Sequence, residues 1–192
     1  ALIAGLPSAG VHAIDLDNVP IPVARFITKS MGAAGGVHVR LSPLDNRVVD
    51  IKFFDSQGLD IDTASERKVE SVFFREDYRR VYLQEIGRIV KAEHIEQRYS
   101  EAFLKTLRPE ALRAIARNFN LVIDYANANA TTILPKILRR LDVAVVELNA
   151  NLDDTRIFQT MEEFEEGMDR LSRITPVLGA RFGVPIDSGG EK

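Results

Sequence analysis

Apolar and polar residues alternate along two short stretches in the first third of the chain. The stretches run from Val37 to Leu41 and from Val48 to Phe54. A period of two is typical of β-strands that bury one face. The turn between them contains Pro43, Asp45 and Asn46, which favour a tight connection because they preset φ or hydrogen-bond to the local backbone. The pattern predicts two antiparallel-looking strands joined by an ordered loop.

Helical spacing, helix-end signals and short apolar runs alternate along the rest of the chain. Helices are predicted over residues 1–9, 22–31, 63–74, 92–107, 109–118, 131–141 and from 160 onward. Strands are predicted over residues 11–16, 121–125, 144–148 and 180–186, with a further short one inside the charged connection 75–90. This alternation favours an α/β fold. We expect two three-layer α/β/α domains, with mixed sheets because of the antiparallel pair.

Two of the predicted helices begin with the spacing of a capping box. In that motif a Ser or Thr and a Glu three residues later satisfy each other's backbone N–H groups. The pairs are Thr63 with Glu66 and Thr160 with Glu163. The helix after Thr160 is long enough to cross over to the last strand, so we expect that strand to lie beside its predecessor at residues 144–148.

The domain boundary is expected near Ala92, which divides the chain into residues 1–91 and 92–192. The sequence begins inside a helix-like pattern and closes on Ser188 to Lys192, a loop that leads onward. We therefore expect the chain to be a piece of a longer protein.

Composition excludes several functional classes. The chain has 192 residues, of which 45% are hydrophobic and 28% are charged, as in an ordinary soluble globular protein. A net charge of −3 gives no electrostatic footprint for nucleic acid or an anionic membrane surface, so neither is expected as a partner. No apolar run approaches the ~18 residues of a transmembrane helix. With no cysteine there is no disulfide or thiolate metal site, which suits a cytoplasmic protein.

The loop at Ser42 carries a family resemblance. The segment Gly35 to Asp55 resembles the serine loop of the α-D-phosphohexomutase superfamily, the phosphomannomutases and phosphoglucomutases. In that family a strand ends in Thr-Ala-Ser-His-Asn-Pro, and an Ile-Lys-Phe-Phe-like strand follows. Aligned without gaps, Ser42 falls on the phosphate-carrying serine and residues 51–54 fall on the following strand. Arg40-Leu41 stands for Thr-Ala, and residues 43–45 stand for His-Asn-Pro.

The second half carries a matching resemblance. Residues 121–130 look like the opening strand and loop of phosphohexomutase domain two. The final loop can be laid on the Asp-Gly-Asp-x-Asp-Arg metal loop of the family. Asp187 then takes the first aspartate, Gly189 the second, Glu191 the third and Lys192 the arginine. Within the superfamily the chain looks most like the mutase-like half of bacterial mannose-1-phosphate guanylyltransferase-type fusion proteins, which carry a nucleotidyltransferase domain upstream.

The resemblance implies a chemistry and assigns residues to it. Phosphoryl transfer needs a nucleophilic oxygen, a divalent cation and fixed positive charge. The implied catalytic residues are Ser42 and Lys52, the implied substrate-binding residues are Arg40 and Lys192, and the implied ligands of Mg²⁺ are Asp187 and Glu191. Glycine at position 189, where the family has an aspartate, means one ligand oxygen fewer. Lysine at position 192 lacks the bidentate fork of the family's arginine. The implied partners are a hexose phosphate and the remaining domains of the same protein.

Each of these residues also has a simpler structural interpretation. Ser42 before a proline is commonly a turn residue that caps the local backbone. Lys52, alternating with apolar neighbours, suits a solvent-facing strand position. Arg40 suits a salt bridge to Asp45 better than a phosphate contact. His38, between two valines, suits a histidine satisfied within the core.

Three functional hypotheses follow. The first is a phosphohexomutase segment with Ser42 as phosphoryl carrier. The second is a non-catalytic module for sugar-phosphate sensing or scaffolding beside a nucleotidyltransferase, which the changed loops favour for this segment. The third is a flavodoxin-like α/β domain, for which an all-parallel sheet is expected. In the family the sugar-recognition loop and the phosphate clamp lie in later domains, so we expect negligible mutase turnover from these 192 residues alone.

Overall fold

The computed structural model describes residues 2–42, 45, 47–108, 112, 116, 119–153, 155–157 and 160–191. Its helices are α1 (Leu2–Ser8), α2 (Ile21–Ser30), α3 (Thr63–Arg75), α4 (Ile95–Thr106), α6 (Leu134–Arg140) and α7 (Met161–Val177), with 3₁₀ turns at Leu83–Glu85 and Asn129–Thr132. Its strands are β1 (Ala13–Asp15), β2 (Gly36–Leu41), β3 (Val49–Phe54), β4 (Ile89–Lys91), β5 (Asn120–Asp124), β6 (Ala144–Leu148) and β7 (Phe182–Pro185). Most of the helix predicted over 109–118 lies outside the described residues.

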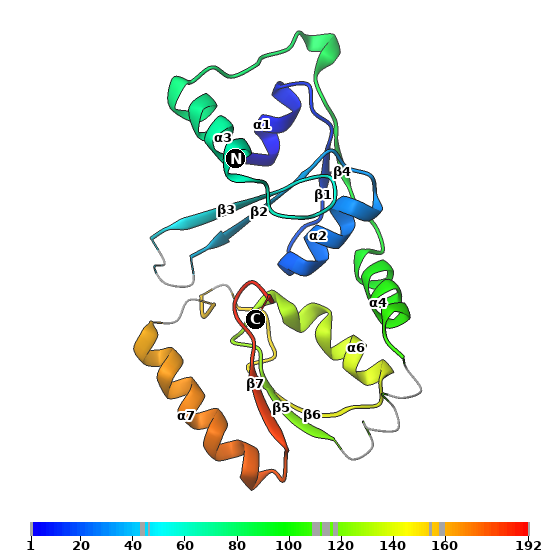
Figure 1. The fold of residues 1–192 in the computed structure, drawn as a ribbon, viewed down its shortest axis with the longest axis vertical. Coiled ribbons are helices and arrows are strands. Elements are labelled where there is room, and N and C mark those ends of the chain that lie inside the picture. The colour runs from blue at the N-terminus through cyan, green and yellow to red at the C-terminus, as the bar shows by residue number, and fades with distance from the viewer. Residues whose placement is uncertain are drawn as a thin grey trace.

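The strands form three sheets, and the α/β fold class is confirmed. β1 and β4 pair in parallel, β2 and β3 pair antiparallel, and β6, β5 and β7 form a parallel sheet in that order. Figure 1 shows the first two sheets with α1, α2 and α3 in its upper part, and the third sheet with α6 and α7 in its lower part. The antiparallel β2–β3 pair counts against the flavodoxin-like alternative.

The position of the last strand differs from the prediction. β7 pairs with β5, where Leu121 is opposite Phe182, and does not lie beside β6. β5 is therefore the central strand. The physical reason lies in its side chains: Val122 and Ile123 are both buried, as in a strand covered on both faces, whereas β6 carries the charged Glu147.

The two predicted capping boxes had different outcomes. At the start of α7, Thr160 Oγ1 accepts from the Glu163 N–H at 3.1 Å and Glu163 Oε2 accepts from the Thr160 N–H at 2.8 Å, so this box is confirmed. The prediction of a capping box at Thr63 was wrong. Asp62 is the N-cap of α3 and accepts from the Ser65 N–H at 2.7 Å, because aspartate is a strong cap and its extended backbone precedes the first helical turn.

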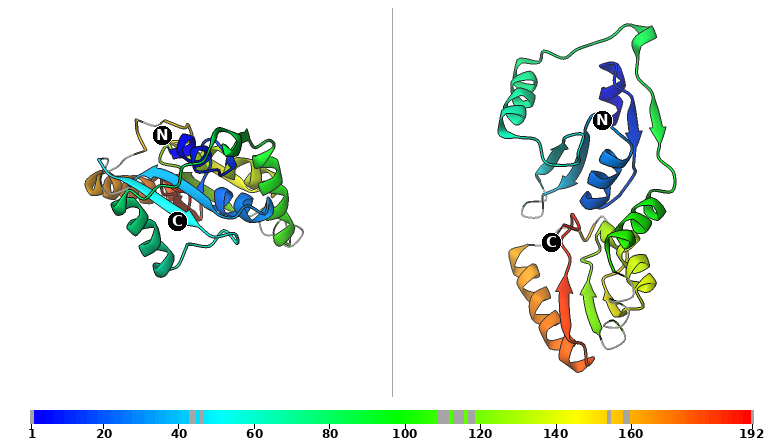
Figure 2. Two further views of the ribbon diagram at one scale, coloured as in Figure 1. Left: turned by 90° about the horizontal axis from the view of Figure 1, so that it is seen from above. Right: turned by 45° about the vertical axis from the view of Figure 1, so that its right-hand side comes forward.

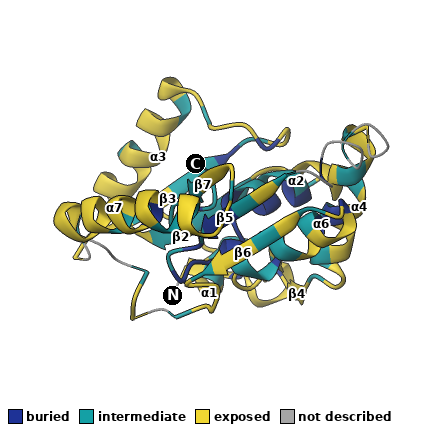
Figure 3. Cartoon of the chain, turned by 90° about the horizontal axis from the view of Figure 1, so that it is seen from below, coloured by how far each residue is buried: buried dark blue, intermediate teal, exposed yellow. Residues whose placement is uncertain are grey.

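The main hydrophobic core joins the two halves of the chain. It packs buried residues of α2 and β3 against buried residues of the α6 region: Val19, Ile21, Val23, Ala24, Ile27, Phe54, Ile133, Ile137 and Leu141. Ile95, Tyr99 and Leu104 of α4 cover its side. Figure 3 shows the buried residues gathered about α2 and β5, while α3 and α7 are mostly exposed. The shared core holds the loops of the two halves close to each other.

A large cavity lies between β1 and the β2–β3 pair. Its volume is about 1230 Å³, and its walls come from α1, α2, α3, β1, β2 and β3. The wall also includes Arg40 and Ser188, so the cavity reaches the loop that follows β7.

No helix in the described part of the chain is long and apolar enough to cross a membrane.

Candidate functional site at the junction of the two halves

The β2–β3 hairpin places its polar residues on one face. Arg40 is opposite Asp50, and His38 is opposite Lys52, so these four side chains share a face of the antiparallel pair. The alternate residues on the other face, such as Ile51, are about half exposed. Lys52 is therefore not simply the solvent-facing member of an alternating strand. It lies on the side of the hairpin that approaches the second half.

The loop after β7 is folded tightly on itself. The Gly190 N–H donates to the Asp187 carbonyl at 2.9 Å, and the Glu191 N–H donates to Asp187 Oδ1 at 2.7 Å. The Ile21 N–H, at the start of α2, donates to the Gly189 carbonyl at 3.0 Å. This bond satisfies one of the backbone donors that a helix leaves unpaired at its first turn. We call residues 187–191 the acidic loop; its chain end lies between the two halves in Figures 1 and 2.

Three cationic side chains of the first half contact the acidic loop. Lys52 Nζ donates to Glu191 Oε2 at 2.7 Å, and Arg25 Nη2 donates to Glu191 Oε1 at 3.1 Å. Arg40 Nη1 is 3.7 Å from Asp187 Oδ2. All five side chains are at most about one-third exposed. We call Arg25, Arg40, Lys52, Asp187 and Glu191 the junction cluster.

The charges of the cluster shift two pKa values. Burial tends to raise the pKa of Glu191, but the bonds from Lys52 and Arg25 outweigh it and lower that pKa below its ordinary value of 4.5. Burial likewise tends to lower the pKa of Arg25, and the carboxylates of Asp60 and Glu191 outweigh it, so the pKa is raised. Both groups are thereby held in their charged forms.

Arg25 was missed by the sequence analysis. Its Nη2 also pairs with Asp60 Oδ1 at 2.8 Å, and its guanidinium carbon lies 4.7 Å from the centre of the Phe54 ring. The available signal was an arginine inside an apolar stretch of α2, next to Ala24 and Phe26. An arginine among apolar residues suggests that acidic partners lie nearby in the fold. The sequence did not show which ones, because Glu191 is distant along the chain.

Ser42 immediately follows β2, where its N–H donates to the Val48 carbonyl at 2.9 Å. The hairpin thus holds Ser42 at the end of the strand that carries Arg40.

Asp45, the expected partner of Arg40, instead accepts two bonds from the Arg47 side chain, at 2.9 Å each. That expectation was wrong, because Arg47 is only two residues away whereas Arg40 points toward Asp50 and Asp187. Lys192 lies outside the described residues.

His38 is partly satisfied within the core. Its Nε2 donates to the Val19 carbonyl at 3.1 Å, an oxygen that also accepts from Asn129 Nδ2 of the second half. Its Nδ1 is buried and has no hydrogen-bond partner within the described residues. Burial is the main cause that lowers the pKa of His38, which favours the neutral ring. His38 therefore bonds within the first half, and Asn129 supplies the bond from the second half to the same carbonyl.

The junction cluster does not fit a bound Mg²⁺ ion. Within the described ranges there is no group of three or more Asp, Glu or His side chains that could hold a metal. Asp187 and Glu191, the ligands that the resemblance implies, lie 3.7 Å and 2.7 Å from the cationic groups of Arg40 and Lys52. Mg²⁺ requires several free oxygen ligands in near-octahedral geometry.

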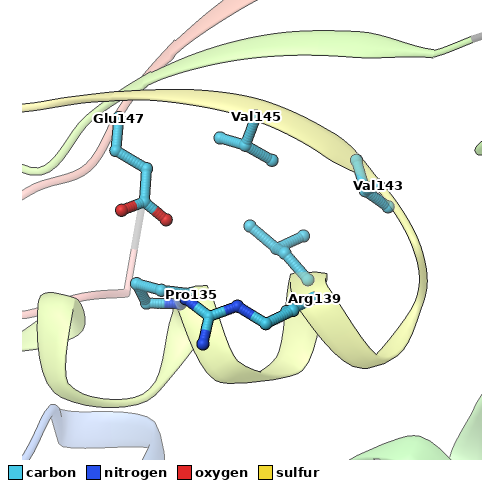
Figure 4. Close-up of a pocket in the computed structure, with 6 residues that line it drawn as sticks. Pro135, Arg139, Val143, Val145 and Glu147 are labelled. Atoms are coloured by element: carbon cyan, nitrogen blue, oxygen red, sulfur yellow. The ribbon is translucent and has the colours of Figure 1, made fainter.

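A smaller hollow lies elsewhere, between α6 and the edge strand β6. Its volume is about 360 Å³, and Figure 4 shows Val143, Val145 and Glu147 on its strand side and Arg139 on its helix side. Leu138 and Pro135 complete the lining. None of these residues belongs to the junction cluster, so this hollow is not the candidate site.

Comparisons with known proteins point to the same class as the serine-loop resemblance. Residues 1–80 match the family described as phosphoglucomutase/phosphomannomutase, alpha/beta/alpha domain I. The chain is 33% identical over 192 residues to the phosphoglucomutase/phosphomannomutase of Thermococcus kodakarensis, covering all of this chain and 41% of that protein. It is 28% identical over 170 residues to the phosphoglucosamine mutase of Methanocaldococcus jannaschii, covering 88% of this chain and 36% of that protein.

A solved structure supports the fold. A phosphoglucomutase/phosphomannomutase family protein from Burkholderia thailandensis aligns with a TM-score of 0.71 at 19% identity, covering 93% of this chain and 38% of that one. By its family match and its curated relatives the chain is similar to proteins of the phosphohexomutase superfamily, and the solved structure supports the fold. The chain spans about two-fifths of the length of the curated relatives it matches.

Proposed function

We propose that this chain presents the serine loop and the acidic loop of a phosphohexomutase-like protein in sugar-phosphate metabolism. The whole protein would move a phosphoryl group between the C6 and C1 positions of mannose or glucose phosphate. The observation that carries the proposal is the contact between the β2–β3 hairpin, whose strands flank the serine loop, and the acidic loop: Lys52 bonds to Glu191 at 2.7 Å, and Arg40 approaches Asp187 at 3.7 Å. Phosphoryl transfer depends chiefly on positioning and fixed charge, which this junction supplies.

The proposed roles follow from position. The oxygen of Ser42 carries the phosphoryl group: its O–P bond breaks as a sugar hydroxyl forms a new one, and the reverse transfer from the other sugar position restores it. Lys52 assists the transfer of the hydroxyl proton. Arg40 and Lys192 supply positive charge to the phosphate of the sugar. Asp187 and Glu191 orient Arg40 and Lys52, since each carboxylate contacts one of these cations in the junction cluster.

The proposal includes a domain organisation. Residues 1–91 form the later part of domain one and residues 92–192 form domain two, with the boundary near Ala92. Because the chain spans about two-fifths of its relatives' length, the other walls of the site belong to further domains. We propose a mannose-1-phosphate guanylyltransferase-type fusion as the parent, with a nucleotidyltransferase domain upstream. The 192-residue chain alone is expected to have negligible mutase turnover.

A second candidate function is a non-catalytic module that senses sugar phosphate or serves as a scaffold. The observation in its favour is the close packing of Arg40 against Gly189, at the position where the resemblance places a metal-binding aspartate. This module would keep the fold and the charge of the site and lack the transfer step.

A mutase assay of the full-length protein separates the two candidates. With glucose 1-phosphate or mannose 1-phosphate and a catalytic amount of the hexose 1,6-bisphosphate, the catalytic candidate predicts turnover that Ser42→Ala abolishes. Ser172→Ala is the matched control, because Ser172 is an exposed serine on α7 whose hydroxyl donates to the Asp169 carbonyl of its own helix. Absence of turnover in the folded full-length protein, or full activity of Ser42→Ala, would overturn the catalytic candidate.

A further inference from the structure

The guanidinium of Arg40 lies between two carboxylates from different parts of the chain. Its Nε is 3.6 Å from Asp50 Oδ2 on β3, and its Nη1 is 3.7 Å from Asp187 Oδ2 in the acidic loop. Both nitrogens are buried, and the side chain as a whole is 16% exposed. Arg40 is therefore a positive charge fixed inside the junction rather than one half of a surface ion pair.

The acidic loop is shaped to receive this guanidinium. A Cβ atom added to Gly189 would overlap Nη1 of Arg40 and come within 2.9 Å of Ile21 Cδ1. The absence of a side chain at residue 189 is what leaves room for Arg40. An aspartate at this position, which the phosphohexomutase metal loop carries, would occupy the same space. The observed position of Arg40 therefore depends on glycine at residue 189.

The other charged side chains of the junction cluster, Lys52, Arg25 and Glu191, are paired with one another. Glu191 accepts from both Lys52 and Arg25, at 2.7 Å and 3.1 Å. An added divalent cation between Asp187 and Glu191 would lie beside three positive charges and would have to displace the bonds that Glu191 accepts from Lys52 and Arg25. Repulsion between like charges is strong in a partly buried site, because water screens it poorly.

We infer that Arg40, seated on Gly189, takes the place of a divalent cation at this loop and holds the acidic loop to the β2–β3 hairpin. The loop binds no Mg²⁺, and the guanidinium supplies the positive charge at this position. This inference goes beyond the proposed function, because it concerns metal affinity and stands whether or not Ser42 takes up phosphate.

Titration of the 192-residue protein with Mn²⁺, followed by electron paramagnetic resonance, tests the inference. An ion that is bound by the wild-type protein and lost in the Asp187→Asn variant is bound at the acidic loop. The wild-type protein should bind no more Mn²⁺ than Asp187→Asn does. The double variant Arg40→Thr/Gly189→Asp removes the guanidinium and adds a carboxylate, and it should bind Mn²⁺ about tenfold more tightly or better. Adding Asp187→Asn to the double variant should abolish that gain.

Two results would overturn the inference. One is Mn²⁺ binding by the wild-type protein that Asp187→Asn removes. The other is a folded double variant, verified by circular dichroism, with no gain in affinity. Should the double variant not fold, Arg40→Gln is read in the same way, because it removes the charge and keeps Gly189. Phosphate on Ser42 is not part of this readout, so failure here and failure of the proposed function are distinguishable.

Discussion

Lys52 and Glu191 lie 139 positions apart in the sequence, yet Lys52 Nζ donates to Glu191 Oε2 at 2.7 Å. The bond joins the strand that follows the serine loop to the loop at the end of the last strand. Glu191 also accepts from Arg25 of α2. One carboxylate therefore fastens the acidic loop to two elements of the first half, and this relationship yields the first two predictions.

Replacing Lys52 by Met, which keeps the length of the side chain, should lower the free energy of unfolding by about 1 kcal/mol, because Glu191 loses a partly buried charged donor. Urea unfolding measures the change. Lys91→Met is the matched control: its partner Asp17 is on the surface, and no measurable change is expected. Equal losses in the two variants would show that the junction bond contributes no more than an exposed pair.

The contribution of Glu191 to stability should depend on pH. Its folded pKa lies below its ordinary value of 4.5, so the folded state favours the charged form. The stabilisation is fully present above the unfolded pKa and is lost as pH falls through the folded pKa. The stability difference between the wild-type protein and Glu191→Gln should therefore be constant near neutral pH and shrink below pH 4.5. Urea unfolding across this range measures it, and a difference that grows on acidification would contradict the prediction.

Two glycines of the second half should respond to alanine with opposite signs. A Cβ on Gly183 of β7 would come within 2.8 Å of Leu171 Cγ on α7, so Gly183→Ala should destabilise by roughly 2 kcal/mol through overpacking. Gly167 lies on α7 with no atom nearer than 3.7 Å to its added Cβ, so Gly167→Ala should stabilise by about 0.5–1 kcal/mol. Melting curves of both variants provide the measurement. No loss of stability in Gly183→Ala would contradict the packing of α7 on β7, and a loss in Gly167→Ala would contradict the open space at that position.

Removing the hydroxyl of Tyr125 should not destabilise the protein. The residue is fully buried, and its hydroxyl oxygen has no hydrogen-bond partner in the described part of the chain. Burial, with a smaller contribution from Glu147, raises the pKa of this phenol. Tyr125→Phe should be neutral or stabilising by about 1 kcal/mol, because an unsatisfied buried polar group is lost. Chemical denaturation tests this, with Tyr78→Phe as a contrast, since Tyr78 donates to the Phe73 carbonyl and should lose stability.

Local patterns were enough to predict much of the fold. The period of two around Ser42 predicted β2 and β3, and the apolar run at residues 121–125 predicted β5. These predictions were possible because the side chains of a strand show by themselves which of its faces are buried. The neighbours of β5 could not be obtained in this way. Whether β7 joins β5 or β6 depends on which edge of the sheet remains available, and that is a property of the assembled sheet.

The candidate site was predictable only in part. The resemblance assigned Ser42, Lys52, Asp187 and Glu191, and the structure brings Lys52 and Glu191 into contact. Arg25 was not found, because its two carboxylate partners come from distant segments. The dependence of Arg40 on Gly189 was likewise invisible, since it is a matter of space between two loops rather than of either sequence motif.

Mass spectrometry of the intact protein tests the central claim, that Ser42 is a phosphoryl carrier, most directly. The full-length protein and its Ser42→Ala variant are compared before and after incubation with glucose or mannose 1,6-bisphosphate. The account predicts a gain of one phosphoryl group, mapped to Ser42 and absent from the variant. A folded wild-type protein that gains no phosphate, or a variant that gains as much, would contradict it and favour the non-catalytic module.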